Sequence, residues 1–134
     1  MPHVSSKKLK QEILNKLYKE FGQAFEKSAR RSKAGLFLGD ILTKTEKVML
    51  AKRFAVIYLL SQEVPVSYIA ESLGMSYSTI FRMSLKYDIG KYSAILRAIR
   101  QEKSDLWGIL EKILRAGLPP RAGRGRWKFL YEKN

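Results

Sequence analysis

The chain has 134 residues, a length that suits one domain with a buried core and is short for two. Its 26 Lys and Arg against 12 Asp and Glu give a formal net charge of +14, which favours a polyanionic partner, nucleic acid before an anionic membrane surface. There is no cysteine and only one histidine, so disulfides, thiolate metal sites and thiol nucleophiles are excluded and no metal is expected.

The N-terminal half is expected to contain two helices with a short apolar segment between them. From 6 to 29 the apolar residues recur every three or four positions with lysines between them, which predicts an amphipathic helix. The basic cluster KSARRSKAG ends or bends this helix, and the apolar segment 35–42 follows. At 42–62, Thr43 and Glu46 have the spacing of a capping box before a long apolar run, which predicts the central core helix.

The C-terminal half continues the helical pattern. Pro65 interrupts it, and a further helix is predicted from about Tyr92 to Ala116, before Gly117 and a pair of prolines. No alternation of apolar and polar residues has useful length, and no apolar run approaches the roughly 18 residues of a membrane helix. We therefore expect an all-α protein without a membrane span, in the cytoplasm with the nucleoid.

The stretch IAESLGMSYSTIFR has the spacing of a helix-turn-helix. Two short helices that cross at about 90–120° need a small residue at the crossing, a residue tolerant of positive φ in the turn and a branched apolar residue in the second helix. Ala70, Gly74 and Ile80 occupy these positions when the motif starts at Val66, and we place it at 66–85. A plain helical hairpin with no DNA-binding role would fit the same residues.

The exposed positions of this motif then predict contacts with DNA. A recognition helix presents its first two turns to base edges in the major groove. Ser76 is placed to cap that helix, Arg82 to make a bidentate contact with guanine, and Lys86 to contact phosphate. The residues expected to contact DNA are Ser67, Tyr68, Ser76, Tyr77, Ser78, Thr79, Arg82 and Lys86.

Two blocks of the sequence together resemble the Trp repressor superfamily, and more closely its Trp-repressor-like branch. The matching residues are Leu42, Thr43, Glu46, Leu50, Ala51, Arg53 and Val56, followed by Gly74, Ser76, Thr79, Ile80 and Arg82. The resemblance covers about Gly35 to Leu96 and implies an intertwined helical homodimer with one helix-turn-helix per subunit, bound to double-stranded DNA at a palindromic operator. We divide the chain into an N-terminal amphipathic dimerisation helix with a basic linker at 1–33, a Trp-repressor-like core with the C-terminal helix at 34–117, and a basic C-terminal tail at 118–134. The C-terminal helix and the tail lie beyond the part that the resemblance covers.

The resemblance also implies a position for a corepressor. In Trp repressors the indole lies between two arginines with a threonine nearby, and the matching residues are Arg53, Arg82 and Thr43. The residue after the second arginine is glycine in those repressors, where the ligand needs room, whereas here it is Met83. We expect Met83 to fill the pocket, so no cofactor is predicted, and tryptophan or another small corepressor is disfavoured.

Other roles for these basic residues stay open. Arg53 and Arg82 could instead contact phosphate or form surface ion pairs with Glu46 or Glu71, and Thr43 needs no ligand because it caps a helix. The arginines of the tail could enter a minor groove as a basic arm, or belong to a disordered segment.

We expect a sequence-specific transcriptional repressor that acts as a homodimer. Catalysis is disfavoured because no paired carboxylates, activated nucleophile or phosphate-binding glycine pattern occurs. The alternatives are the DNA-binding module of a transposition system, a non-specific nucleic-acid-binding protein without ligand control, and a purely structural protein.

Overall fold

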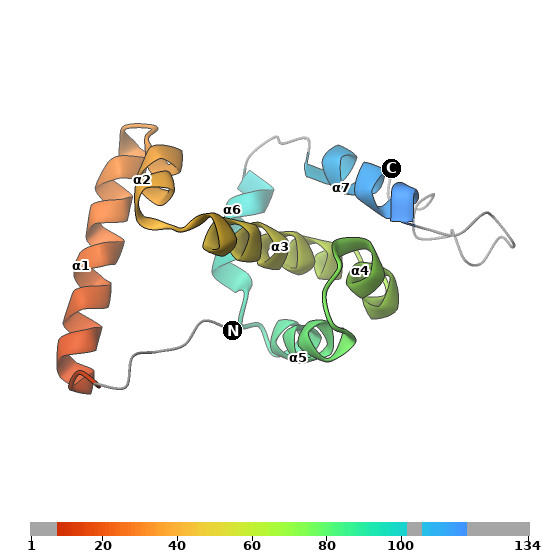
Figure 1. Cartoon of the computed structure of the whole chain (residues 1–134), viewed down its shortest axis with the longest axis horizontal. Helices are drawn as coiled ribbons and strands as arrows, with labels where there is room; N and C mark the ends of the chain where they lie inside the picture. The colour runs from red at the N-terminus through yellow and green to blue at the C-terminus, as the bar shows by residue number, and fades with distance from the viewer. Residues whose placement is uncertain (1–7, 102–105, 118–134) are drawn as a thin grey trace, which may run out of the picture. The chain divides into compact units, whose positions relative to one another are not determined.

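The structure is a computed structural model that describes residues 8–101 and 106–117. Within these ranges all regular secondary structure is α-helical, which confirms the predicted all-α class (Figure 1). The helices are α1 (Gln11–Arg30), α2 (Ala34–Ile41), α3 (Lys44–Ser61), α4 (Val66–Leu73), α5 (Tyr77–Asp88), α6 (Ser93–Gln101) and α7 (Leu106–Gly117). None of these helices is long and apolar enough to cross a membrane.

The chain divides into two compact units, 1–47 and 48–134. In the first unit α1 and α2 pack against each other through phenylalanine rings. The Phe37 ring of α2 lies 5.6 Å from the rings of both Phe21 and Phe25 of α1, measured between centroids. These contacts explain why the first unit extends past the predicted segment 1–33 and includes α2.

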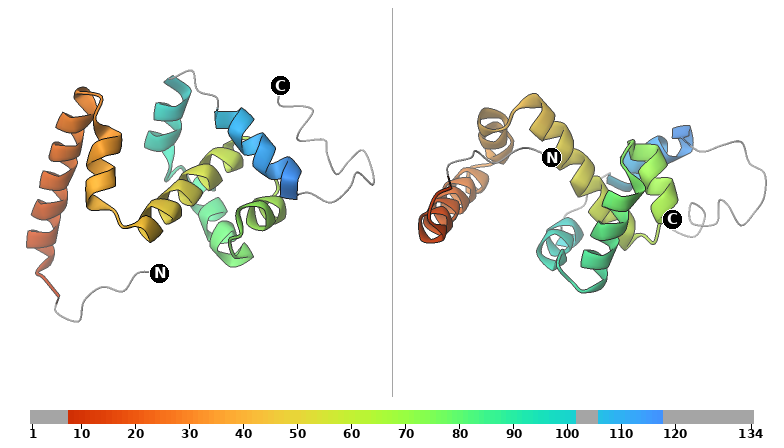
Figure 2. Two further views of the ribbon diagram at one scale, coloured as in Figure 1. Left: turned by 45° about the horizontal axis from the view of Figure 1, so that its top comes forward. Right: turned by 60° about the horizontal axis from the view of Figure 1, so that its bottom comes forward.

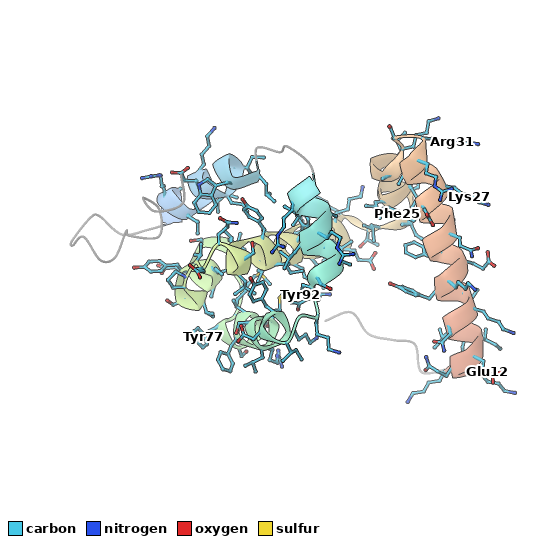
Figure 3. The ribbon with its side chains drawn as sticks, turned by 180° about the vertical axis from the view of Figure 1, so that it is seen from behind. Glu12, Phe25, Lys27, Arg31, Tyr77 and Tyr92 are labelled. Atoms are coloured by element: carbon cyan, nitrogen blue, oxygen red, sulfur yellow. The ribbon has the colours of Figure 1, made fainter. Side chains whose placement is uncertain are left out.

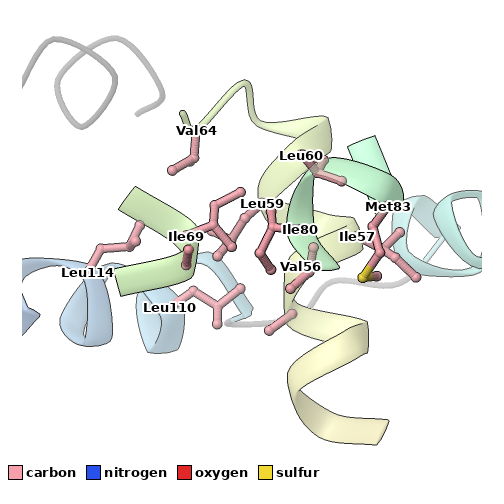
Figure 4. Close-up of a cluster of buried hydrophobic side chains, with 12 residues drawn as sticks. Val56, Ile57, Leu59, Leu60, Val64, Ile69, Ile80, Met83, Leu110 and Leu114 are labelled. Atoms are coloured by element: carbon pink, nitrogen blue, oxygen red, sulfur yellow. The ribbon is translucent and has the colours of Figure 1, made fainter. Parts of the chain in front are cut away.

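The second unit has its core where α3, α4, α5 and α7 meet (Figure 4). The C-terminal half of α3 supplies five of the buried side chains, because its apolar residues there occupy consecutive positions and face all of its neighbours. The core residues are Ala55, Val56, Ile57, Leu59, Leu60, Val64, Ile69, Ala70, Ile80, Met83, Leu110 and Leu114. Both views of Figure 2 show α3, α4, α5 and α7 close to one another.

The helix that the sequence predicted from Tyr92 to Ala116 corresponds to α6 and α7, and residues 102–105 between them lie outside the described residues. α7 packs against α4 through Leu110 and Leu114. The basic tail 118–134, with its predicted groove-binding arm, lies outside the described residues.

Candidate nucleic-acid interface

α4 and α5 are joined by a tight turn that depends on Gly74. This residue has φ 63° and ψ 43°, the left-handed conformation that residues with a Cβ rarely adopt. The backbone N–H groups of Gly74 and Met75 both donate to the carbonyl oxygen of Ala70, which satisfies the end of α4. Ala70 and Ile80 are buried, so the small residue, the glycine and the branched residue occupy the positions that the sequence predicted.

Ser76 caps the N-terminus of α5, as predicted. Its Oγ accepts a hydrogen bond of 3.2 Å from the Thr79 N–H, and the two hydroxyl oxygens lie 2.7 Å apart. Both hydroxyl groups therefore take part in holding the first turn of α5, and Thr79 is half-buried. Their predicted contacts with DNA stay a prediction.

One face of α5 is buried and the opposite face is free for a partner. Ile80 and Met83 point into the core. Successive helical residues are rotated by about 100°, so Ser78 lies near the middle of the opposite face, and Arg82 and Lys86 lie along one edge of it. All three side chains are exposed. Arg82 forms no ion pair with any described residue, so its guanidinium is available to an anionic partner.

The other edge of this face is aromatic. Tyr77 and Phe81 are 57% and 45% exposed, and their rings stack with centroids 6.2 Å apart and an interplanar angle of 10°. Tyr77 lies at the start of α5 (Figure 3). The sequence prediction included Tyr77 and missed Phe81, although the four-residue spacing from Tyr77 places both residues on one side of a helix.

α4 contributes less to this surface than the sequence predicted. Ser67 is exposed in its first turn, but Tyr68 is half-buried and packs against the core. Lys52 of α3 was not predicted, and its Nζ lies 3.8 Å from the position that a Cβ on Gly74 would occupy. A cationic group therefore lies next to the turn between α4 and α5.

The chain matches the family described as Trp repressor protein over residues 16–100. It belongs to this family. The match begins within α1 and ends within α6, so it extends the resemblance in the N-terminal direction and leaves α7 outside. Trp repressor proteins are helix-turn-helix DNA-binding regulators. No curated protein and no solved structure matches the chain.

The residues that match the corepressor position of Trp repressors belong to both units of the chain. Thr43, in the first unit, forms a capping box in which its N–H donates to Glu46 Oε1 at 2.8 Å and its hydroxyl accepts from the Glu46 N–H at 3.1 Å. Arg53, Arg82 and Met83 belong to the second unit, where the arginines are exposed and Met83 is buried at 6% exposure. The predicted pairs of the arginines with Glu46 or Glu71 do not form among the described residues.

Two further features bear on ligands. The described residues contain no cluster of three or more side chains suited to a metal ion.

In the first unit a basic hollow lies at the C-terminal end of α1, where Arg30 pairs with Glu26 at 2.8 Å. It is lined by Lys27, Ser28, Arg30, Arg31 and Lys33. This hollow is therefore a second cationic surface, apart from α5.

Proposed function

We propose that this Trp repressor family protein is a sequence-specific transcriptional repressor that binds double-stranded DNA as a homodimer. In this proposal α4, the Gly74 turn and α5 form the helix-turn-helix, and α5 enters the major groove. The observation that carries the proposal is the exposed face of α5, which begins at a serine-capped N-terminus. This face presents Ser78, whose hydroxyl lies 3.4 Å from that of Ser76, together with Arg82 and Lys86, which form no ion pair with a described residue.

The side chains of this face suit different parts of the duplex. The planar guanidinium of Arg82 fits the O6 and N7 acceptors of guanine. Lys86 lies one turn further along the helix, where phosphate is within reach of a flexible ammonium group. Ser78 belongs to the first turn of α5 and precedes both Arg82 and Lys86 along the helix. Arg82 is therefore proposed to set base preference, and Lys86 to set affinity.

The homodimer is supported by α1, which has no buried residue within the single chain. Its exposed apolar side chains include Ile13 and Leu17, and such a face in one monomer favours association. A two-fold dimer predicts a palindromic operator with half-sites about one helical turn apart. A dimer bound to such a site at a promoter would block RNA polymerase. The protein would then act in the cytoplasm, in association with the nucleoid.

We further propose that this repressor works without tryptophan or another small corepressor. Met83 directly follows Arg82, and its side chain contributes to the core around Ile80. The side chain thus occupies space that a glycine would leave open. Titration of tryptophan by calorimetry, with and without DNA, should give no heat of binding.

Selection of bound sequences from a random duplex pool tests the function. The selected duplex should be palindromic and bind about 10³-fold or more tightly than scrambled DNA. Binding to both should weaken as salt rises, with a logarithmic slope of about −0.9 for each phosphate neutralised. Equal, salt-sensitive binding to every sequence would instead show a non-specific nucleic-acid-binding protein.

Arg82→Ala tests the assignment of α5. This change should relax the preference at one base pair of each half-site and cost about tenfold or more in specific affinity. Arg97→Ala, which removes an exposed arginine of α6, is the matched control and should leave the base preference unchanged. Unaltered specificity in a folded Arg82→Ala variant would refute the assignment.

A further inference from the structure

We infer that Tyr77 and Phe81 form an apolar reading edge that selects thymine through its C5-methyl group. The inference rests on the proposed function, since it assigns base preference to a second edge of the same helix. Tyr77 and Phe81 lie in the first two turns of α5, the part of a recognition helix that reaches base edges.

The exposure of these rings requires an explanation. Large aromatic side chains normally bury much of their area, yet Tyr77 is 57% and Phe81 45% exposed. The core contacts of α5 are made by Ile80 and Met83, which face the opposite way, so the fold itself does not need either ring. We therefore expect a binding partner to cover both rings.

The chemistry of this edge indicates which part of DNA it contacts. Phe81 has no donor or acceptor, so it cannot read the hydrogen-bonding pattern of a base. The C5-methyl group of thymine is the apolar group that a base presents in the major groove, and phenylalanine is suited to contact it. The stacked Tyr77 ring restricts the Phe81 side chain, so little rotamer freedom remains to be lost on binding.

Charge decides between DNA and an apolar protein as the partner. Arg82 directly follows Phe81 in the sequence, and Lys86 lies one helical turn after Arg82. Arg82 and Lys86 are both exposed and form the cationic edge of the same face. A purely apolar protein surface would leave these two charges desolvated and unpaired on association, whereas a duplex supplies phosphate and guanine acceptors for them. The aromatic edge and the cationic edge together therefore match a major groove with thymine near guanine.

Substitution of deoxyuridine for thymidine, one position at a time in the selected duplex, tests the inference. Deoxyuridine pairs as thymidine does and lacks only the methyl group. At one or two thymines per half-site the wild-type protein should lose about fourfold in affinity, the factor expected for one buried methyl group. Phe81→Ala should bind the thymidine and deoxyuridine duplexes equally at those positions, and Tyr77→Ala should reduce the difference.

Leu85→Ala is the matched control, because Leu85 is an equally exposed apolar residue of α5 but lies in its third turn. This variant should keep the full thymidine preference. The inference is overturned if deoxyuridine has no effect on the wild type, if Phe81→Ala keeps the wild-type preference, or if Phe81→Ala changes self-association and leaves DNA affinity unchanged. A wild-type protein that selects no sequence at all would instead overturn the proposed function.

Discussion

The turn between α4 and α5 depends on the backbone of a single residue, Gly74. Its φ of 63° is strained for a residue with a Cβ, while the space around it is open, since Lys52 Nζ at 3.8 Å is the nearest contact. Gly74→Ala should therefore cost about 1 kcal/mol in the free energy of unfolding through backbone strain alone. Urea denaturation measures this cost. Gly74→Asn should cost less, because asparagine tolerates the left-handed region, and an equal cost for both would point to a steric cause.

The capping box at the start of α3 gives stability a dependence on pH. Hydrogen bonds from the backbone N–H and the side chain of Thr43 lower the pKa of Glu46 below its ordinary value of 4.5. Because the pKa is lower in the folded state, the contribution is present above pH 4.5 and is lost as pH falls through the lowered pKa. Melting temperatures of wild type and Glu46→Gln should therefore differ at pH 7 and converge towards pH 3. Parallel curves would contradict this linkage.

At the scale of elements, α7 is a helix that lies outside residues 16–100, the part of the chain that the family match covers. Leu114 of α7 is fully buried against α4, whereas Ile113 beside it is 38% exposed. Leu114→Ala should reduce the free energy of unfolding by about 2–4 kcal/mol through loss of apolar contact and the cavity left behind. Ile113→Ala, the control, should cost less than about 1 kcal/mol. Equal small effects in urea denaturation would show that α7 is not part of the cooperative core.

The elements also show how far the sequence predicts this molecule. Periodicity and capping patterns predicted α1, α3 and the turn at Gly74, because these depend on local spacing and on single residues such as Ser76. The contact between α4 and α7 was not predicted, since periodicity shows that a helix has an apolar face but not which other helix packs against that face. Phe81 could have been found from its four-residue spacing to Tyr77, but an apolar ring in a helix is expected in the core, and the structure shows that this ring is 45% exposed.

At the scale of the whole molecule, the proposed homodimer depends on the apolar face of α1. Ile13 and Leu17 lie on this face, 46% and 55% exposed, and a charge placed there would be buried without a partner in the dimer. Ile13→Lys should therefore weaken dimerisation by about tenfold or more, as measured by sedimentation equilibrium. It should also replace tight binding to the palindromic operator by weak binding to a single half-site.

Gln23→Lys provides the control, because it adds the same charge on the opposite side of α1, about 80° or more from the nearest apolar residue of the face by helical rotation. It should leave the dimer and operator affinity intact, apart from a small gain from the added positive charge. If both variants stay dimeric, α1 does not form the interface. If the wild type is monomeric and still selects a palindrome, each half-site is bound independently, and the α1 face must have another partner.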